Sequence, residues 1–137
     1  MNVSSFCSTD VITAEATDTL FEAAQKMARN HVGALAVMDE GRLAGVISEA
    51  DVVVAVAEEA SLFTAAVEDY MTEDPITVEA GDPAEVAARR MVEHAIGHLI
   101  VIEAGSTVGM VSKGDLLAVG AVPEPLAPPA AGKARTG

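Results

Sequence analysis

Hydrophobic and polar positions follow the same succession of periods in each half of the chain. Extended stretches at 11–13 and 75–78 precede segments with apolar residues at helical spacing, which are Leu20, Ala23, Ala24 and Met27, and then Ala84, Ala87, Ala88 and Met91. Apolar runs at 34–38 and 43–47, and again at 98–102 and 107–111, predict two hairpins with turns at Glu40-Gly41 and Ala104-Gly105-Ser106. Apolar segments at 52–57 and 116–118 predict a final helix in each half.

The two halves superimpose without a gap when the chain is shifted by 64 positions. Segments 10–51 and 74–115 then share 16 identical residues, whereas composition alone would give about four. Each half reads as strand, helix, strand, strand, helix, and a unit of about 50 residues is too small to be stable alone. We therefore predict an α+β fold in which two β-α-β-β-α repeats, related by a pseudo-twofold axis, pack sheet on sheet with their helices outside.

The ends of the predicted helices carry recognisable signals. Thr19 with Glu22 forms a capping box, and in the second half Asp82 is the expected cap with Pro83 at the first helical position. Both helices are expected to end near a glycine, Gly33 or Gly97.

The predicted division of the chain has three parts. The first repeat with a short N-terminal segment occupies 1–60, and a connector helix at 65–71 with the second repeat occupies 61–120. A weaker copy of the connector precedes the first repeat, where Phe6 and Cys7 take the places of Tyr70 and Met71. Residues 121–137, rich in Ala and Pro, are expected to form a disordered tail because they cannot bury enough apolar surface to fold.

Charge and cysteine content narrow the classes of partner. The formal net charge of −13 disfavours nucleic acid and anionic membrane surfaces, because counterion release requires a basic patch. No apolar stretch is long enough to span a bilayer, and the first ten residues do not resemble a signal peptide. One cysteine, Cys7, excludes an intrachain disulfide and is compatible with a reducing cytoplasm, which we take as the expected location.

One polar pattern is duplicated, and it carries the candidate chemistry. Ser48 and Asp51 recur as Ser112 and Asp115, each pair at a junction from strand to helix. Amides at a helix start attract phosphate, and a carboxylate can accept hydrogen bonds from the vicinal hydroxyls of a ribose. Serine followed by an acid three residues later is also an ordinary capping box, and a cap residue can still face a cleft. Both interpretations stay open for both pairs.

The duplicated motifs resemble a known family. Tyr70-Met71-Thr72, Pro75-Ile76-Thr77-Val78, Gly97-His98-Leu99-Ile100-Val101 and Gly109-Met110-Val111-Ser112-Lys113-Gly114-Asp115, with their counterparts in the first half, are similar to a tandem pair of cystathionine beta-synthase (CBS) domains, called a Bateman module. The similarity covers about 6–119. It implies a regulatory module that binds AMP, ADP, ATP or S-adenosylmethionine between its halves and commonly pairs into flat homodimers.

The resemblance also implies roles for individual residues. Asp51 and Asp115 would bind ribose, Ser48 and Ser112 would lie on the phosphate side, and the extended segments and strand starts would contact the base. Many family members carry proline where this chain has Ala36 and Ile100, which loosens the match within a strand. The expected ligand-binding residues are Ile12, Thr13, Gly33, Ala34, Leu35, Ser48, Asp51, Ile76, Thr77, Gly97, His98, Leu99, Ser112, Lys113 and Asp115.

The two candidate sites differ in charge. Lys113 and His98 stand in the second half where the first half has Glu49 and Ala34. The sequence alone therefore predicts that phosphorylated ligands prefer the site of Ser112 and Asp115, and that the other site takes a less charged ligand or stays empty.

Other chemistry is not expected. His94 and His98 are four residues apart, but Gly97 intervenes and the pair is not duplicated, so a metal site is disfavoured. Cys7 occupies an apolar position, and no duplicated histidine accompanies the duplicated serine, so no catalytic residues and no cofactor beyond the regulatory ligand are predicted.

Two functions remain open at this stage. One is a non-catalytic module that senses an adenosine-containing ligand and signals to a separate partner protein. The alternative is a structural dimerisation module whose cleft is vestigial. Ligand-dependent thermal stabilisation would separate the two.

Overall fold

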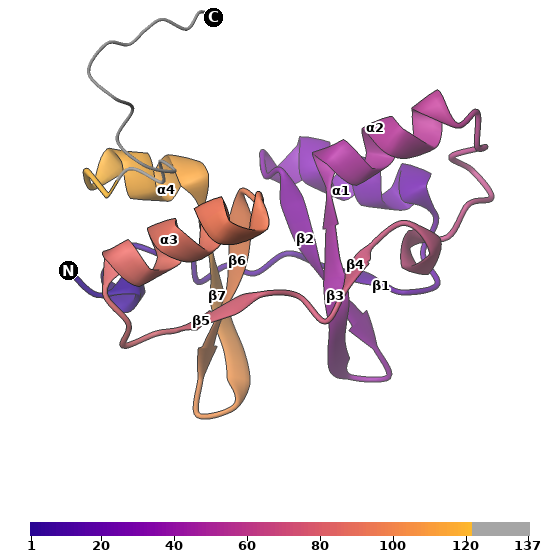
Figure 1. The fold of residues 1–137 in the computed structure, drawn as a ribbon. Helices are drawn as coiled ribbons and strands as arrows, with labels where there is room; N and C mark the ends of the chain where they lie inside the picture. Colours follow the sequence, from indigo (N-terminus) through magenta and orange to yellow (C-terminus); the bar gives the residue numbers. More distant parts are fainter. Residues whose placement is uncertain (122–137) are drawn as a thin grey trace, which may run out of the picture.

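The computed structural model describes residues 1–121, and the account that follows is confined to them (Figure 1). The first repeat contains β1 (Thr13–Glu15), α1 (Leu20–Asn30), β2 (Ala34–Asp39), β3 (Arg42–Ser48) and α2 (Glu49–Ala57). The second contains β5 (Thr77–Glu79), α3 (Ala84–His94), β6 (His98–Glu103), β7 (Ser106–Ser112) and α4 (Lys113–Ala118). The predicted order of strand, helix, strand, strand, helix is confirmed in both halves.

Each repeat forms its own sheet. The first has the order β1-β2-β3-β4, in which β4 (Thr72–Glu73) comes from the connector, and the second has the order β5-β6-β7. The hairpins β2–β3 and β6–β7 turn through Glu40-Gly41 and Ala104-Gly105, with φ values of 51°, 78°, 52° and 81°. Positive φ at both central residues matches the twist of the flanking strands, so the predicted turns are confirmed.

The second strand of each repeat is buried on both faces. Leu35 and Val37 lie in a core that includes residues of α1 and α2, and Leu99 and Val101 lie in the equivalent core of the second repeat. Ala36, on the other face of β2, is fully buried but belongs to neither core. The same is true of its counterpart in β6, Ile100. Because successive side chains point to opposite faces of a sheet, this burial comes from the facing sheet. The predicted α+β fold with sheets packed on each other and helices outside is confirmed.

Two segments outside the repeats pack in equivalent ways. The 3-10 helix η2 (Val67–Asp69) of the connector docks on the first repeat, where the Val67 N–H donates to the Asp18 carbonyl at 2.8 Å. The 3-10 helix η1 (Val3–Ser5) docks on the second repeat, where the Val3 N–H donates to the Asp82 carbonyl at 2.9 Å. The 64-residue repeat therefore extends to the N-terminus, as the weaker copy of the connector predicted. The sequence grouped this N-terminal segment with the first repeat, whereas its contacts are with the second (Figure 1).

Two local predictions are wrong, and a third is refined. The connector helix expected at 65–71 is only the three-residue η2. Helix α3 has Pro83, and not Asp82, at its N-cap, one residue later than predicted. The first helices turn at His31 and Ala95, which adopt left-handed φ values of 55° and 53°, two residues before the expected glycines.

Gly33 does not end the helix, and it lies against the side chain of Glu49. A Cβ placed on it would lie 2.8 Å from Oε1 of Glu49, so a larger residue would displace that side chain. This contact lies beside the candidate site described below.

No helix within residues 1–121 is both long and apolar enough to cross a membrane. The predicted Ala- and Pro-rich tail lies, from residue 122 onward, outside the described residues.

Candidate functional site

The two serine–aspartate pairs have nearly the same local geometry. Oδ2 of Asp51 accepts a hydrogen bond from the Ser48 N–H at 2.8 Å, and Oδ2 of Asp115 accepts one from the Ser112 N–H at 2.8 Å. The Ser48 hydroxyl donates to the same oxygen of Asp51 at 3.1 Å, whereas the Ser112 hydroxyl accepts the Asp115 N–H at 3.1 Å. Both pairs therefore cap a helix, as the capping interpretation predicted.

The pair Ser48–Asp51 borders a cavity large enough for a nucleoside. A cavity of about 380 Å³ opens between the repeats, within the range of about 300–1,000 Å³ typical of small-molecule sites. It gathers the end of β3 and the start of α2 with the connector and the start of β6. Its lining residues are Gly33, Val46, Ser48, Glu49, Ala50, Asp51, Thr72, Pro75, Ile76, Ala95, Ile96, Gly97 and His98.

The composition of this cavity suits an amphipathic ligand. Apolar side chains of Val46, Pro75, Ile76 and Ile96 provide surfaces for a flat ring, while Ser48, Asp51, Thr72 and His98 provide polar groups. The second oxygen of Asp51, Oδ1, has no hydrogen-bond partner within residues 1–121. The carboxylate therefore keeps acceptor capacity that ribose hydroxyls could use.

A smaller cavity lies at the equivalent place in the pseudo-symmetric molecule. It measures about 60 Å³ and is lined by Ser8, Asp10, Val11, Ile12, Val32, Ala34, His98 and Met110. Ser8, Val11 and Ile12 correspond to Thr72, Pro75 and Ile76 of the larger cavity, but Ser112 and Asp115 do not line it. His98 reaches both cavities, and Met110 is larger than its counterpart Val46, so less space remains on this side.

The structure divides the expected ligand-binding residues into three groups. Gly33, Ser48, Asp51, Ile76, Gly97 and His98 line the larger cavity, and Ile12, Ala34 and His98 line the smaller one. The remaining residues line neither of these cavities, and they are Thr13, Leu35, Thr77, Leu99, Ser112, Lys113 and Asp115.

Two of those residues have side chains on the helix side of their sheets. Leu35 and Leu99 are fully buried in the cores on the helix side of their sheets. Residues two apart share a face of a strand, whereas neighbours do not, so Leu99 points away from the cavity that His98 lines.

The sequence grouped His98 with only one of the two sites, whereas its side chain reaches both cavities. It assigned His98 to the site of Ser112 and Asp115, because all three belong to the second repeat. The backbone of His98 does pair with that of Ser112, but its side chain lines the cavity of Ser48 and Asp51. The larger cavity joins the serine–aspartate pair of the first repeat with the strand start of the second. The smaller cavity is lined by the strand starts of both repeats and by neither serine–aspartate pair. The expected preference of phosphate for the Ser112–Asp115 site relied on Lys113 and His98. Because His98 reaches both cavities, it does not distinguish them, and that prediction now depends on Lys113.

Several lining residues were not among those expected. Thr72 and Pro75 belong to a motif that the sequence singled out, and Glu49 was recognised as the counterpart of Lys113, but none was assigned to the site. Ile96 precedes the predicted strand start and had no polar signal. Its place in the cavity depends on the turn after α3, which the sequence located two residues too late.

His98 and Glu49 lie close together at the edge of the larger cavity. Cε1 of His98 is 3.4 Å, and Oε1 of Glu49 2.8 Å, from the point where a Gly33 Cβ would lie. Burial lowers the pKa of His98 from its ordinary value, and the negative charges of Glu49 and Asp115 oppose that change in part. The imidazole is therefore largely uncharged at neutral pH.

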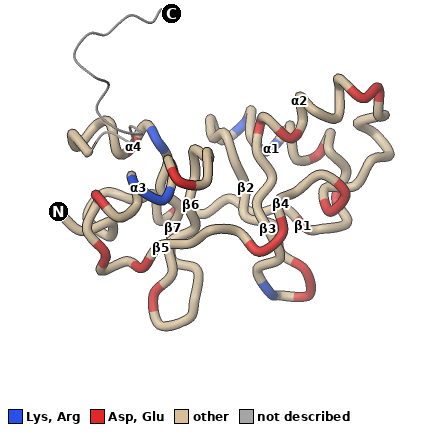
Figure 2. Tube along the Cα trace, in the orientation of Figure 1, with Lys and Arg blue, Asp and Glu red and all other residues tan. Residues whose placement is uncertain are grey.

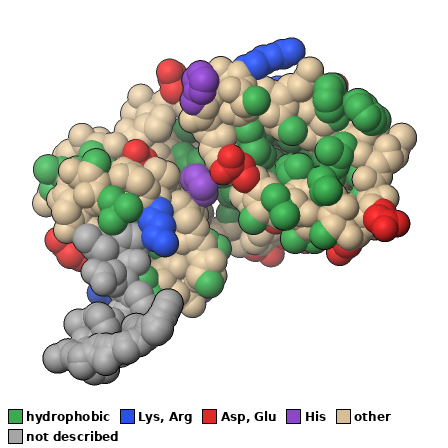
Figure 3. All heavy atoms as spheres, turned by 90° about the horizontal axis from the view of Figure 1, so that it is seen from above, with side chains coloured by type: hydrophobic (Ala, Val, Ile, Leu, Met, Phe, Trp, Pro, Cys, Tyr) green, Lys and Arg blue, Asp and Glu red, His purple; other side chains and the backbone are tan. Residues whose placement is uncertain are grey.

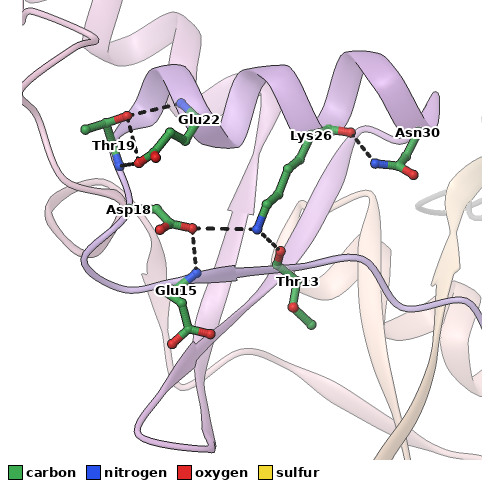
Figure 4. Close-up of polar contacts among 7 residues, drawn as sticks. All are labelled: Thr13, Glu15, Asp18, Thr19, Glu22, Lys26 and Asn30. Carbon is green, nitrogen blue, oxygen red and sulfur yellow. Dashed lines mark hydrogen bonds and ion pairs between the residues drawn. The ribbon is translucent and has the colours of Figure 1, made fainter.

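A second duplicated constellation has a structural role. Lys26 Nζ donates to the Thr13 carbonyl at 2.8 Å and lies 3.7 Å from Oδ2 of Asp18, which also accepts the Glu15 N–H (Figure 4). In the second repeat Arg90 donates to the Thr77 carbonyl at 2.7 Å and lies 3.9 Å from Asp82. The two cations are 64 residues apart, so the duplication repeats the same contact in both halves.

Thr13 and Thr77, which line neither cavity, take part in these contacts through their backbone carbonyls. Their carbonyls fix the strand that precedes each helix to a cation on that helix. The molecule has few other cations, whereas acidic residues are distributed over both halves (Figure 2).

The alternative chemistries receive no structural support within residues 1–121. His94 ends α3 and is exposed, whereas His98 begins β6, so the two do not share a helix. No group of three or more potential metal-ligating side chains is found in this part of the chain. Burial raises the pKa of the Cys7 thiol, and the charge of Asp115 raises it further, so the thiolate is disfavoured.

Comparison with known proteins gives the family of this fold. The model of the CBS domain matches residues 3–65 and again residues 67–121. The chain belongs to the CBS domain family. Its two consecutive CBS domains form a Bateman module, as the resemblance predicted.

Solved CBS structures share this architecture. The CBS domain protein PAE2072 from Pyrobaculum aerophilum, solved in complex with AMP, has a TM-score of 0.79 and 32% identity, covering 85% of this chain and 90% of its own. The CBS domain pair of protein MJ0100, in complex with 5′-methylthioadenosine and S-adenosyl-L-methionine, has a TM-score of 0.80 and 26% identity, covering 87% and 94%.

Curated relatives include CBS proteins of different lengths. The CBS domain-containing protein YhcV of Bacillus subtilis is 28% identical over 79% of this chain and 77% of its own length. Inosine-5′-monophosphate dehydrogenase of Korarchaeum cryptofilum is 34% identical over 82% of this chain, which spans only 23% of that enzyme. The CBS pair thus occurs both in short proteins and as part of an enzyme.

Proposed function

We propose that this CBS pair is a non-catalytic regulatory module that binds an adenosine-containing ligand in the cavity of Ser48 and Asp51. The observation that carries the proposal is the 380 Å³ cavity between the repeats, in which the Asp51 carboxylate faces apolar surfaces from Ile76 and Ile96. Two solved relatives are described with AMP, 5′-methylthioadenosine and S-adenosyl-L-methionine, all of which contain adenosine.

The proposed pose follows from the chemistry of the lining. Asp51 accepts hydrogen bonds from the ribose hydroxyls, and the adenine ring lies between the side chains of Ile76, Ile96 and Val46. Because these groups come from both repeats and from the connector, occupancy fixes the position of one repeat relative to the other. Such a ligand-dependent change in geometry is what a separate partner protein would detect.

We also propose that two copies pair through the helices of the first repeat. Val53 and Val56 of α2 are 65% and 57% exposed, and Phe63 of the connector is 67% exposed beside Phe21, with ring centroids 4.7 Å apart. An apolar groove lined by Ala24, Met27 and Val52 runs between α1 and α2. Apolar side chains gather on this half of the surface (Figure 3). Pairing with a second copy would remove this surface from water.

Thermal unfolding of the chain with and without adenosine, AMP, ATP and S-adenosylmethionine tests the binding proposal. A ligand at a hundredfold its Kd adds about 2.7 kcal/mol to the unfolding free energy, which raises the Tm of a domain of this size by several degrees. Stabilisation by at least one of these compounds supports the proposal. The absence of any shift, at concentrations that saturate a millimolar site, contradicts it and favours the structural dimerisation module.

A further inference from the structure

The larger cavity carries an unusual charge for a nucleotide site. Its described lining includes two carboxylates, Glu49 and Asp51, and one imidazole, but neither lysine nor arginine. At the position equivalent to Glu49 the second repeat has Lys113. The first position of the helix therefore changes from positive to negative between two otherwise similar sites.

The start of helix α2 offers little to an anion. The Glu49 N–H donates to the Gly33 carbonyl at 3.0 Å, so the first amide of the helix is already used. Both carboxylates lie in the first turn of the helix. There they partly neutralise the positive end of the helix dipole, which would otherwise attract a phosphate. A phosphate placed there would meet two negative charges and one fewer free amide.

His98 does not compensate for these carboxylates. Its ring borders the cavity next to Glu49, and burial lowers its pKa, so it is mostly neutral at physiological pH. Seen from above, an acidic side chain and a histidine lie side by side between the two halves (Figure 3).

We propose that this cavity selects adenosine compounds whose 5′ substituent is uncharged or positively charged, and that it discriminates against adenosine phosphates. The proposal rests on the proposed function and narrows its ligand class. A single carboxylate at about 6 Å from a phosphate, in a partly solvated site, changes affinity by about tenfold. Glu49 supplies that discrimination, while Asp51 is occupied with the ribose.

Isothermal titration of the full chain at neutral pH with adenosine, S-adenosylmethionine and AMP is the test. Adenosine and S-adenosylmethionine are expected to bind at least about tenfold more tightly than AMP. Glu49→Gln should reduce this ratio, and Glu49→Lys should reduce it further or invert it. Raising the salt concentration should also reduce the ratio in the native protein, because Glu49 is exposed and its field is screened.

Glu103→Lys is the matched control. It makes the same change of charge at the far end of β6, about 16 Å along the strand from His98, on an exposed residue. It should leave the ratio of affinities unchanged. Circular dichroism melting of each variant establishes that the fold is retained.

The outcomes separate the two proposals. If AMP binds as tightly as adenosine or more tightly, or if Glu49→Lys leaves the ratio unchanged, the charge selection is overturned while ligand binding stands. If no adenosine compound binds the native chain, the proposed function itself fails. A ratio that depends on Glu49 and not on Glu103 supports both.

Discussion

The two serine–aspartate pairs of this CBS protein show how little a shared backbone motif decides about ligand binding. Ser48–Asp51 and Ser112–Asp115 cap equivalent helices through equivalent hydrogen bonds, and both aspartates keep their N-cap contact at 2.8 Å. Yet only the first pair lines the cavity of about 380 Å³. The motif provides the polar groups, whereas the residues facing it from the other repeat decide whether there is space.

Besides Met110 in place of Val46, two further substitutions distinguish the sites. His98 stands where the first repeat has Ala34, and its ring reaches both cavities from a position between the repeats. Glu49 stands where the second repeat has Lys113, which reverses the charge at the helix start. Duplication followed by change at these positions gives one chain two unequal sites.

The largest expected effect is on ligand affinity. Asp51→Ala removes the acceptors of the ribose hydroxyls, which should weaken adenosine binding by about a hundredfold, because each hydrogen bond to a charged group contributes about 1.5–3 kcal/mol. Asp115→Ala, which makes the same change at the other pair, should alter it by less than about threefold. Titration calorimetry measures both. Equal losses in the two variants would show that the pairs are equivalent.

The next largest effect is on the free energy of unfolding. It compares two glycines, Gly45 and Gly109, each of which packs against the segment that precedes a repeat. A Cβ at Gly45 would collide with the Thr72 carbonyl of β4, so Gly45→Ala should cost about 2 kcal/mol of unfolding free energy. At Gly109 the same Cβ would lie 2.7 Å from the Ser8 carbonyl, where a single bridge and not a strand pair is disturbed. Gly109→Ala should therefore cost less. Urea unfolding of the two variants gives the order, and a larger loss for Gly109→Ala would contradict it.

A smaller effect is expected on self-association. Val53→Asp places a charge on the apolar face of the first repeat and should weaken dimerisation by about tenfold. Leu117, the equivalent residue of the second repeat, is 52% exposed but lacks equivalents of the nearby Phe21 and Phe63, so Leu117→Asp should have a lesser effect. Sedimentation velocity over a concentration series compares the two. A native chain that remains monomeric throughout refutes the pairing.

The smallest effect concerns pH. The pKa of His98 is lower in the folded chain than in the unfolded chain, because burial disfavours its charged form. Between the folded pKa and the ordinary value of about 6.5 the unfolded chain binds more protons, so stability should decline as the pH falls through this window. His98→Ala should remove this part of the decline in Tm, whereas the control variant His94→Ala, which keeps His98, should retain it. If Tm depends on pH in the same way in both variants, a group other than His98 causes the decline.

Much of the fold could be predicted because each local sequence pattern occurs in both repeats, so one copy supports the interpretation of the other. The turns at Glu40-Gly41 and Ala104-Gly105 carry the sequence of a tight hairpin in both halves, and the structure has that hairpin in both. The errors fall where tertiary contacts override local preference. Asp82 looks like a cap but instead accepts the Glu79 N–H at 3.0 Å and lies near Arg90, which moves the cap to Pro83.

The site was harder to predict than the fold, because it depends on which residues of the two repeats face each other. Asp51 and Ser48 were found from their repetition, and both line the cavity. The sequence did not place His98 in the same cavity as Ser48 and Asp51. It grouped His98 with Ser112 and Asp115, because all three belong to the second repeat. Thr72, Pro75 and Ile96 enter the cavity only through the path of the connector and the turn after α3, which no single pattern specifies.

A crystal structure of the full chain grown with adenosine tests the central claim most directly. We predict density for one adenosine in the cavity between the repeats, with its ribose hydroxyls within hydrogen-bond distance of the Asp51 carboxylate and its base against Ile76 and Ile96. Adenosine bound at Asp115 with the Asp51 cavity vacant, or bound to Asp51 through no ribose hydroxyl, would contradict the account.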